Sequence, residues 1–370
     1  MNRMVGVTLS TLLVLGLAVF GAAEALDLRR GASAGPPTST PLPPAVTLTA
    51  LVGTEKRSYF SDPAVQRRLA ELGFVVELET AASRDMAARD LKGYDVAFPS
   101  SAPVAEKIVR ANRPQGVTSP FYSPIAVATF QPIVDALRPV GVARGNINGY
   151  QSFEVDRYLE LVRDNTRWDQ LPRNSTYPAR KAVLVSTNDV RSSGAAAMYL
   201  AIASYVANGN QVVANSDQVD AVMPTLQRIF LGQGYAESWS ESSFDDYLTQ
   251  GAGKVPMLLV YESQFLELER RRDGSIAPGM MLLYPTPDVL SKHTVIGLTD
   301  DGARLGDALT NDPQLQRLAA EFGFRTNDPN VFNEVFAGSG ANPPRLFGQV
   351  IDPPRYEVLE SLVTRLAEQY

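Results

Sequence analysis

Residues 46–78 read VTLTALVGTEKRSYFSDPAVQRRLAELGFVVEL, and this stretch decides the fold. Val46–Val52 is rich in β-branched and apolar residues, which is typical of a strand. Asp62-Pro63 then begins a predicted helix with its apolar residues on one face, and Gly73 ends it. Phe74–Leu78 is predicted as a second strand. A strand, a helix and a strand in this order indicate a parallel sheet covered by helices.

The alternation of strands and helices continues along the chain. The later predicted strands are Tyr94–Phe98, Ser123–Phe130, Ala182–Val185, Met257–Val260, Met280–Tyr284 and Val295–Leu298. The later predicted helices are one capped by Ser83, then Ala102–Asn112, Tyr158–Val162, Ser193–Ala207, Asp300–Leu309, Pro313–Phe322 and Tyr356–Gln369. Residues 327–354 are predicted to be rich in loops. The pattern as a whole predicts an α/β protein.

The first 25 residues predict export across a membrane. A short basic start at Met1–Arg3 is followed by the uncharged apolar run Met4–Ala22 and by the small-x-small sequence Ala23-Glu24-Ala25. This order is that of a signal peptide, but the apolar run is also close to the length that spans a bilayer. A cleaved signal and a retained anchor therefore both remain open. Residues 26–44 are rich in Pro, Gly and Ser and are predicted to form a tether.

Composition narrows the class of protein further. The chain has no cysteine, so it has neither a cysteine-linked lipid anchor nor disulfides. Its formal net charge is −6 and it has no basic run, which argues against a nucleic acid partner. About 325 residues follow the tether. Because a domain with a single hydrophobic core is usually shorter than this, two lobes are expected.

Polar residues follow two of the predicted strands. Thr54, Glu55 and Lys56 come after the first strand, and Ser100-Ser101 come after the third. Ligands of open parallel sheets bind outside the carboxyl ends of the strands. Taken singly, each serine is better explained as a helix cap. Their recurrence at several strand ends favours one polar site.

The segment Ser186–Gly194, STNDVRSSG, follows a predicted strand and begins a predicted helix. The unpaired N–H groups and the dipole of a helix start favour an anion or a polar oxygen. Ser192 and Ser193 add hydroxyl groups there, and Arg191 adds a charged group. The alternative is that a serine simply caps the helix.

In their order and spacing, these segments resemble the type 2 periplasmic (extracellular) substrate-binding proteins. The chain is similar to the molybdate- and sulfate-binding branch and to uncharacterised actinobacterial solute-binding proteins. The resemblance covers roughly residues 46–325 and departs from the family in lacking a lipobox cysteine. The segments that carry it are the strand ends at Thr54 and Ser100-Ser101, the crossover strand Ser123–Pro132, the helix start Ser192-Ser193-Gly194, the strand end Val260–Gln264, and Leu315–Arg325.

The resemblance implies two α/β lobes joined by two crossover strands that close on a ligand in the cleft. Lobe 1 is expected to contain residues 45–121 plus 283–370, and lobe 2 residues 122–282. The residues predicted to bind the ligand are Thr54, Glu55, Lys56, Ser100, Ser101, Ser123, Asn188, Arg191, Ser192, Ser193, Tyr261 and Glu262. Arg191 and Lys56 favour an anion, whereas Glu55 and Glu262 favour an amine or a cation, so the charge of the ligand stays open.

No residue is predicted to be catalytic. His293 is the single histidine, no G-x-S-x-G sequence occurs, and a cysteine-free chain with one histidine is poorly suited to zinc. No metal or cofactor is predicted. We expect an extracytoplasmic monomer that captures a small polar or anionic molecule, such as an oxyanion, and presents it to a membrane transporter or another membrane protein. The alternatives are a membrane-tethered structural or interaction protein with this fold and no ligand and, least favoured, an extracytoplasmic hydrolase.

Overall fold

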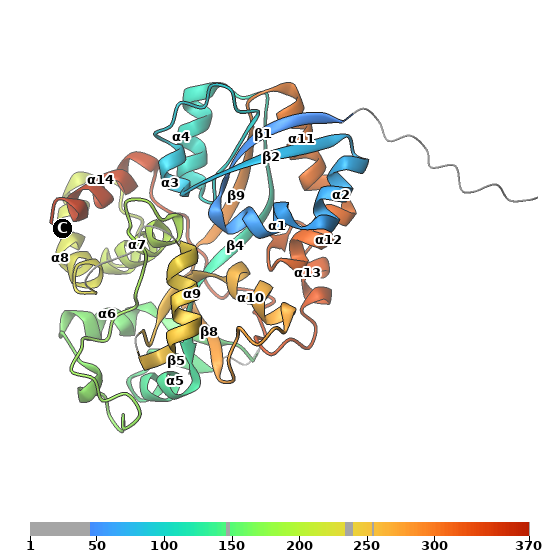
Figure 1. Cartoon of the computed structure of the whole chain (residues 1–370). Helices are drawn as coiled ribbons and strands as arrows, with labels where there is room; N and C mark the ends of the chain where they lie inside the picture. The colour runs from blue at the N-terminus through green and yellow to red at the C-terminus, as the bar shows by residue number, and fades with distance from the viewer. Residues whose placement is uncertain (1–44, 146–148, 234–239, 254, 370) are drawn as a thin grey trace, which may run out of the picture. The chain divides into compact units, whose positions relative to one another are not determined.

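The first predicted unit forms as the sequence pattern indicates. In the computed structural model, β1 (Val46–Gly53) and β2 (Phe74–Ala81) pair in parallel and α2 (Pro63–Glu71) connects them (Figure 1). The carboxylate of Asp62 caps α2 by accepting the backbone N–H groups of Ala64 and Val65 at 2.8 and 3.3 Å. The structure describes residues 45–145, 149–233, 240–253 and 255–369, which belong to one compact unit, 42–370. The predicted leader, 1–25, and tether, 26–44, lie outside the described residues.

The remaining elements alternate along the chain. The other strands are β3 (Val96–Phe98), β4 (Gly116–Phe130), β5 (Ala143–Gly145), β6 (Gln151–Glu154), β7 (Leu258–Tyr261), β8 (Met280–Thr286), β9 (Leu290–Gly297) and β10 (Arg325–Thr326). The other α-helices are α1 (Arg57–Ser61), α3 (Ser83–Met86), α4 (Ala102–Asn112), α5 (Gln131–Leu137), α6 (Val155–Arg163), α7 (Gly194–Ala207), α8 (Ser216–Phe230), α9 (Ser240–Gln250), α10 (Glu262–Arg271), α11 (Asp300–Asn311), α12 (Pro313–Glu321), α13 (Pro329–Val335) and α14 (Tyr356–Ala367). A 3-10 turn, η1 (Thr54–Lys56), follows β1.

The strands form a mixed sheet in the order β2-β1-β3-β9-β4-β8-β6-β5, with β7 and β10 also paired to β4. The predicted parallel arrangement is confirmed for β2, β1 and β3. β9 returns from late in the chain and inserts antiparallel between β3 and β4. The parallel pairing is therefore interrupted after β3 and recurs between β6 and β8.

The 15-residue strand β4 runs through both parts of the sheet. Its first part, Gly116–Pro124, pairs with β9, and its second part, Ile125–Phe130, pairs with β7 and β8. The sequence predicted only Ser123–Phe130 as a strand, because Pro120 interrupts the β-type pattern before it. The carboxyl ends of β1 and β3 and the end of β7 thus lie near the middle of β4.

Two local predictions, a strand and a helix cap, were wrong. Ala182–Val185 forms no strand, because the segment makes only isolated bridges at Ala182 and Ser186. Residues 327–354 are rich in loops, as predicted, apart from one helix, α13, that Asp328 caps by accepting the N–H of Asn330 at 2.9 Å. Ser83 does not cap α3, because its hydroxyl hydrogen-bonds to Ser100 instead.

Two large apolar cores lie against the sheet. One gathers buried residues of β1, β3, β9, α2, α11 and α12, and the other gathers those of α6, α7 and α8. The buried face of α14 belongs to the second core, and α14 contacts α8, α7 and α4 (Figure 1). α14 falls in the segment assigned to lobe 1 but packs mainly against the segment assigned to lobe 2; the division into lobes stays a prediction. Among the described residues, no helix has the length and apolar character needed to cross a membrane.

Candidate functional site

Three hydroxyl groups from distant parts of the chain meet where the strands end. Ser83 follows β2, Ser100 follows β3 and Tyr261 ends β7, and all three are nearly fully buried. The Ser100 Oγ lies 2.7 Å from the Ser83 Oγ and 3.1 Å from the Tyr261 hydroxyl. We call Ser83, Ser100 and Tyr261 the hydroxyl cluster.

Backbone and strand contacts hold the hydroxyl cluster in place. The backbone N–H of Ser100 donates to the Ser83 Oγ at 2.7 Å, and the hydroxyl of Ser291 on β9 donates to the Ser100 carbonyl at 2.6 Å. Burial, and secondly the charge of Glu55, raises the pKa of Tyr261 well above its usual value. Tyr261 is therefore a neutral hydroxyl that can both donate and accept.

The N-terminus of α7 lies directly against the hydroxyl cluster. A Cβ built on Gly194, the first residue of α7, would lie 2.9 Å from the Tyr261 hydroxyl and 3.0 Å from the Ser100 Oγ. The Ser193 Oγ caps the helix by accepting the N–H of Ala196 at 3.2 Å. A 14-residue helix presents partial positive charge at this end, which favours an anionic or oxygen-bearing group.

A buried group of titratable residues follows β1. Lys56 is fully buried, forms an ion pair with Glu55, and places its Nζ 3.2 Å from the Nδ1 of His293. The same Nζ lies 4.7 Å from the centroid of the Phe98 ring. We call Glu55, Lys56 and His293 the charged cluster. Burial lowers the pKa of Lys56, although the neighbouring Glu55 opposes that shift.

Burial favours the neutral form of His293, and the Lys56 Nζ beside its Nδ1 indicates the tautomer of the ring. Burial, and secondly the charge of Lys56, lowers the pKa of His293 well below its usual value. Since the Lys56 ammonium can only donate, Nδ1 accepts and the ring proton sits on Nε2. Nε2 is buried and has no hydrogen-bond partner among the described residues. The ring centroid lies 5.8 Å from that of Tyr261, so the charged cluster adjoins the hydroxyl cluster.

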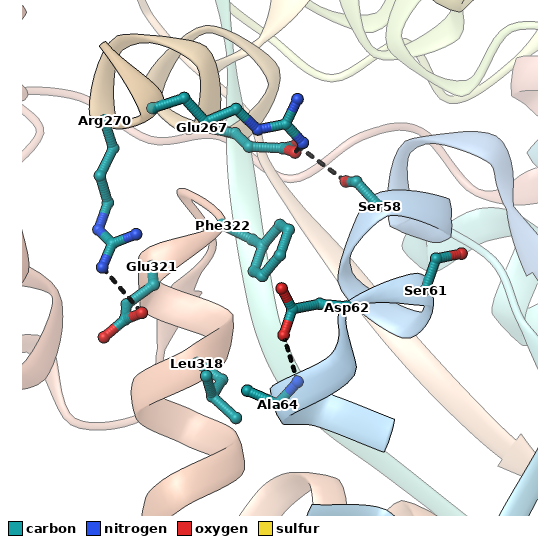
Figure 2. Close-up of a pocket in the computed structure, with 10 residues that line it drawn as sticks. Ser58, Ser61, Asp62, Ala64, Glu267, Arg270, Leu318, Glu321 and Phe322 are labelled. Carbon is teal, nitrogen blue, oxygen red and sulfur yellow. Dashed lines mark hydrogen bonds and ion pairs between the residues drawn. The ribbon is translucent and has the colours of Figure 1, made fainter. Parts of the chain in front are cut away.

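A groove leads from the surface to Glu55. A cavity of about 200 Å³ is lined by Thr54 and Glu55 of η1 together with residues of α9 and α10, among them Glu267. It shares lining residues with a second cavity of about 460 Å³ between α1, α2, α10 and α12. Figure 2 shows two of the interactions across this second cavity: Ser58 donates to Glu267 at 2.9 Å, and Arg270 pairs with Glu321 at 2.8 Å.

Solved structures with the same fold are known, although no family model and no curated protein matches the chain. The chain is similar to a sulfate-binding protein from Mycobacterium tuberculosis (TM-score 0.52, 16% identity, 83% of this chain and 94% of that one). It is also similar to an ABC transporter solute-binding protein from Thermotoga lettingae bound with α-D-tagatose (TM-score 0.54, 13% identity, 87% and 93%). A third is iron-bound HitA from Pseudomonas aeruginosa (TM-score 0.51, 11% identity, 87% and 98%). The chain has the two-lobed fold of periplasmic solute-binding proteins.

Within this solute-binding-protein fold, the structure brings about half of the predicted site residues together. Ser100, Tyr261 and Ser193 lie in or beside the hydroxyl cluster, and Glu55 and Lys56 form the charged cluster. Thr54 lines the cavity that leads to Glu55.

Glu262 has a different role from the predicted one. It is fully buried and accepts from Arg325 at 2.6 and 2.8 Å and from the Tyr284 hydroxyl at 2.8 Å. The guanidinium of Arg325 lies over the rings of Phe332 and Phe347, at 4.4 and 4.8 Å. Because both carboxylate oxygens are occupied, Glu262 joins α10 to β10 within the protein.

The other predicted residues lie around the site, and the hydrogen bonds described for Ser123, Asn188, Arg191 and Ser192 are to other residues of the protein. The Ser123 Oγ accepts the N–H of Ser263, and Asn188 donates to the Ser243 hydroxyl, both at 3.1 Å. Arg191 is about half exposed and forms an ion pair with Asp189, and the Ser192 hydroxyl donates to the Asp189 carbonyl at 3.4 Å. Ser101 is buried and occupies the N-cap position of α4 without a side-chain cap.

Sequence reasoning missed four residues of the site: Ser83, Gly194, Ser291 and His293. Ser83 and Gly194 stood at a strand end and a helix start, where the same argument that selected Ser100 could have found them. Nothing in the sequence near His293 indicates that it meets Lys56, 237 positions away. Among the described residues there is no group of three or more side chains arranged to hold a metal ion.

Proposed function

We propose that this chain is an extracytoplasmic solute-binding protein that holds a small polar or anionic molecule between its two lobes, without catalysing a reaction on it. The hydroxyl cluster facing the N-terminus of α7 carries the proposal. Neutral hydroxyls and the N–H groups of a helix start can replace the hydration shell of a solute without an opposing full charge. The groove that reaches Glu55 supports an entry path from this side.

The partner in this proposal is a membrane transporter or another membrane protein that receives the solute. Export rests on the first 25 residues of the sequence, which are expected to act as a signal peptide or an anchor. N-terminal sequencing of the exported form should begin near Leu26, or the chain should remain in the membrane fraction. A soluble protein with Met1 intact would contradict both versions.

A second candidate is a structural or interaction protein that keeps the fold and binds no solute. The close approach of Gly194 to Ser100 and Tyr261 favours it, because the two sides of the site touch directly. Under the first candidate, this contact must open for the solute to enter.

A thermal-shift screen of sulfate, molybdate, sugars, amino acids and metal ions separates the two candidates. A ligand at 100 times its dissociation constant adds about 2.7 kcal/mol to the free energy of unfolding. In the Ser192→Ala/Ser193→Ala variant, the ligand-induced gain in the free energy of unfolding should be smaller than in the wild type. Without ligand, the variant should lose only about 1 kcal/mol of stability, the usual cost of a lost helix cap. Asn215→Ala is the matched control, because Asn215 caps α8 by accepting the N–H of Gln218 at 3.0 Å. No shift in the wild type would favour the second candidate. An unchanged ligand shift in the double variant would mean that a solute binds, but away from the start of α7.

A further inference from the structure

The charged cluster contains a buried ion pair that a purely structural position would not need. Lys56 and Glu55 are adjacent in sequence, and their side chains are 0% and 5% exposed. Removing two charges from water costs free energy that their attraction often only balances, and apolar residues of similar size can replace such pairs without loss of stability. Stability alone therefore does not account for the Lys56–Glu55 pair, which lies at the edge of the site.

The other buried charges beside the site are also balanced, whereas Asp85 and Asp245 are exposed to solvent. Arg191 pairs with Asp189 in the loop before α7, and Arg84 of α3 pairs with Glu360 of α14. His293 and Tyr261 add no charge, because burial keeps both side chains neutral. A bound ion with a net charge would leave that charge uncompensated in a buried place, which is unfavourable.

The neutral site nevertheless has two distinct poles. One pole consists of hydrogen-bond donors: the N-terminus of α7 with the hydroxyls of Ser100 and Tyr261, which suit a carboxylate. The other pole is the carboxylate of Glu55, which suits an ammonium group. Tyr261 connects the two poles through His293: its hydroxyl lies beside Gly194 and Ser100, and its ring lies beside the His293 ring, whose Nδ1 is 3.7 Å from the Glu55 Oε1.

We propose that the site selects a small zwitterion, an α-amino acid or a molecule like it, whose carboxylate binds at the α7 pole and whose ammonium group binds at Glu55. The inference rests on the proposed function and names the class of solute for that same site. When the ligand's ammonium group binds the carboxylate of Glu55, Lys56 keeps its hydrogen bond to His293. Glu55 then faces two positive charges, those of Lys56 and of the ligand's ammonium group. The ligand's own carboxylate offsets the second of them. From the sequence alone, Lys56 favoured an anionic ligand and Glu55 a cationic one. A zwitterion, which carries both charges, is consistent with both residues.

Calorimetric titration of the exported chain tests the inference with L-alanine and L-serine. The matched probes are N-acetyl-L-alanine, which lacks the ammonium group, L-alaninamide, which lacks the carboxylate, and sulfate and D-glucose. We expect the amino acids to bind and each singly charged derivative to bind about tenfold more weakly or worse, because each leaves one pole unpaired. This comparison uses the wild type and needs no variant to fold.

Substitution at one pole gives a second readout. Glu55→Gln should weaken alanine binding by about tenfold or more and reduce the penalty for the N-acetyl derivative. The control is Asp312→Asn, which changes a carboxylate that pairs with Arg68 away from the site and keeps an N-cap side chain on α12. Equal affinity for alanine and its derivatives, or an unchanged affinity in Glu55→Gln, overturns the inference. Binding of sulfate or glucose with no binding of the amino acids also overturns it but leaves the proposed function standing, and silence of the whole panel contradicts both.

Discussion

At Gly194, the lack of a side chain is what lets the first turn of α7 touch the hydroxyl cluster. The hydroxyls of Tyr261 and Ser100 and the Cβ of Ser83, from three other segments, occupy the space around it. Helix propensity alone would favour alanine over glycine here by up to about 1 kcal/mol. For Gly194→Ala, helix propensity alone therefore predicts a more stable protein, whereas the close contact predicts a less stable one.

Gly194→Ala should destabilise the protein by about 1–3 kcal/mol, because the new methyl group must displace Tyr261 or Ser100. Chemical denaturation measures the free energy of unfolding. Gly253→Ala is the control, since nothing lies within 4 Å of a Cβ at Gly253. A Gly194→Ala variant as stable as the wild type would mean that the α7 start and the hydroxyl cluster separate readily.

Asp288 predicts a dependence of stability on pH. It is fully buried, and burial raises the pKa of its carboxyl group well above the usual value. The folded state therefore holds this proton at a pH where the unfolded chain, with a pKa of about 3.9, has released it. This group's contribution is complete below about pH 4 and is lost as the pH rises toward the folded-state pKa.

Asp288→Asn removes this titration and keeps an oxygen for the N–H of Val289, which Asp288 accepts at 2.7 Å. Between pH 4 and 8, the wild type should lose stability relative to the variant. Thermal denaturation across this range measures the difference. A constant difference, or one of opposite sign, would show that the carboxyl group ionises normally in the folded protein.

At the scale of elements, local sequence signals predicted most helices because those signals are complete within about ten residues. Asp62 before α2 and Asp312 before α12 cap their helices as their positions indicate. The position of β9 between β3 and β4 could not be predicted, because it depends on pairing between residues far apart in the chain. The hydrogen bond between Ser83 and Ser100 depends in the same way on the sheet order.

The contribution of the C-terminal helix α14 to the stability of the protein can be measured by substitution. Leu362 on its inner face is fully buried in the core shared with α7 and α8. Leu362→Ala should cost about 2–5 kcal/mol, the usual range for a buried leucine. Leu346→Ala makes the same chemical change at a position that is 78% exposed and should cost little. Equal effects of the two substitutions would mean that α14 does not pack as described.

At the scale of the whole molecule, the proposed lobes should move relative to each other when a solute binds. The chain has no cysteine, so cysteines introduced at the exposed positions Ser61 and Arg138 can carry spin labels without competing sites. These positions lie in the segments assigned to lobe 1 and lobe 2. The distance distribution between the labels should change on ligand binding, whereas labels at Ser61 and Arg304, both assigned to lobe 1, should keep theirs. Two unchanged distributions would contradict a hinged pair of lobes.

The sequence predicted the fold class of the whole molecule, whereas the contacts among the predicted site residues could not be predicted from it. Strand ends can be predicted from composition, and the structure places Ser100, Lys56 and Tyr261 at or just after the strand ends, where the sequence put them. The partners of each side chain follow from the packing of β9 and α7 between segments hundreds of residues apart. This is why Glu262 was expected at the cleft and instead lies against Arg325.

The most direct test of the central claim is a calorimetric titration of Tyr261→Phe with the solute that stabilises the wild type most in the screen. The substitution removes one hydroxyl from the hydroxyl cluster and keeps the ring. We predict a dissociation constant raised by about tenfold, the usual effect of a lost hydrogen bond in a closed site. Tyr59→Phe, which removes another buried hydroxyl, one that donates to the Leu315 carbonyl at 3.3 Å, should leave the dissociation constant unchanged. Equal affinity of Tyr261→Phe and the wild type would contradict a solute site at the hydroxyl cluster.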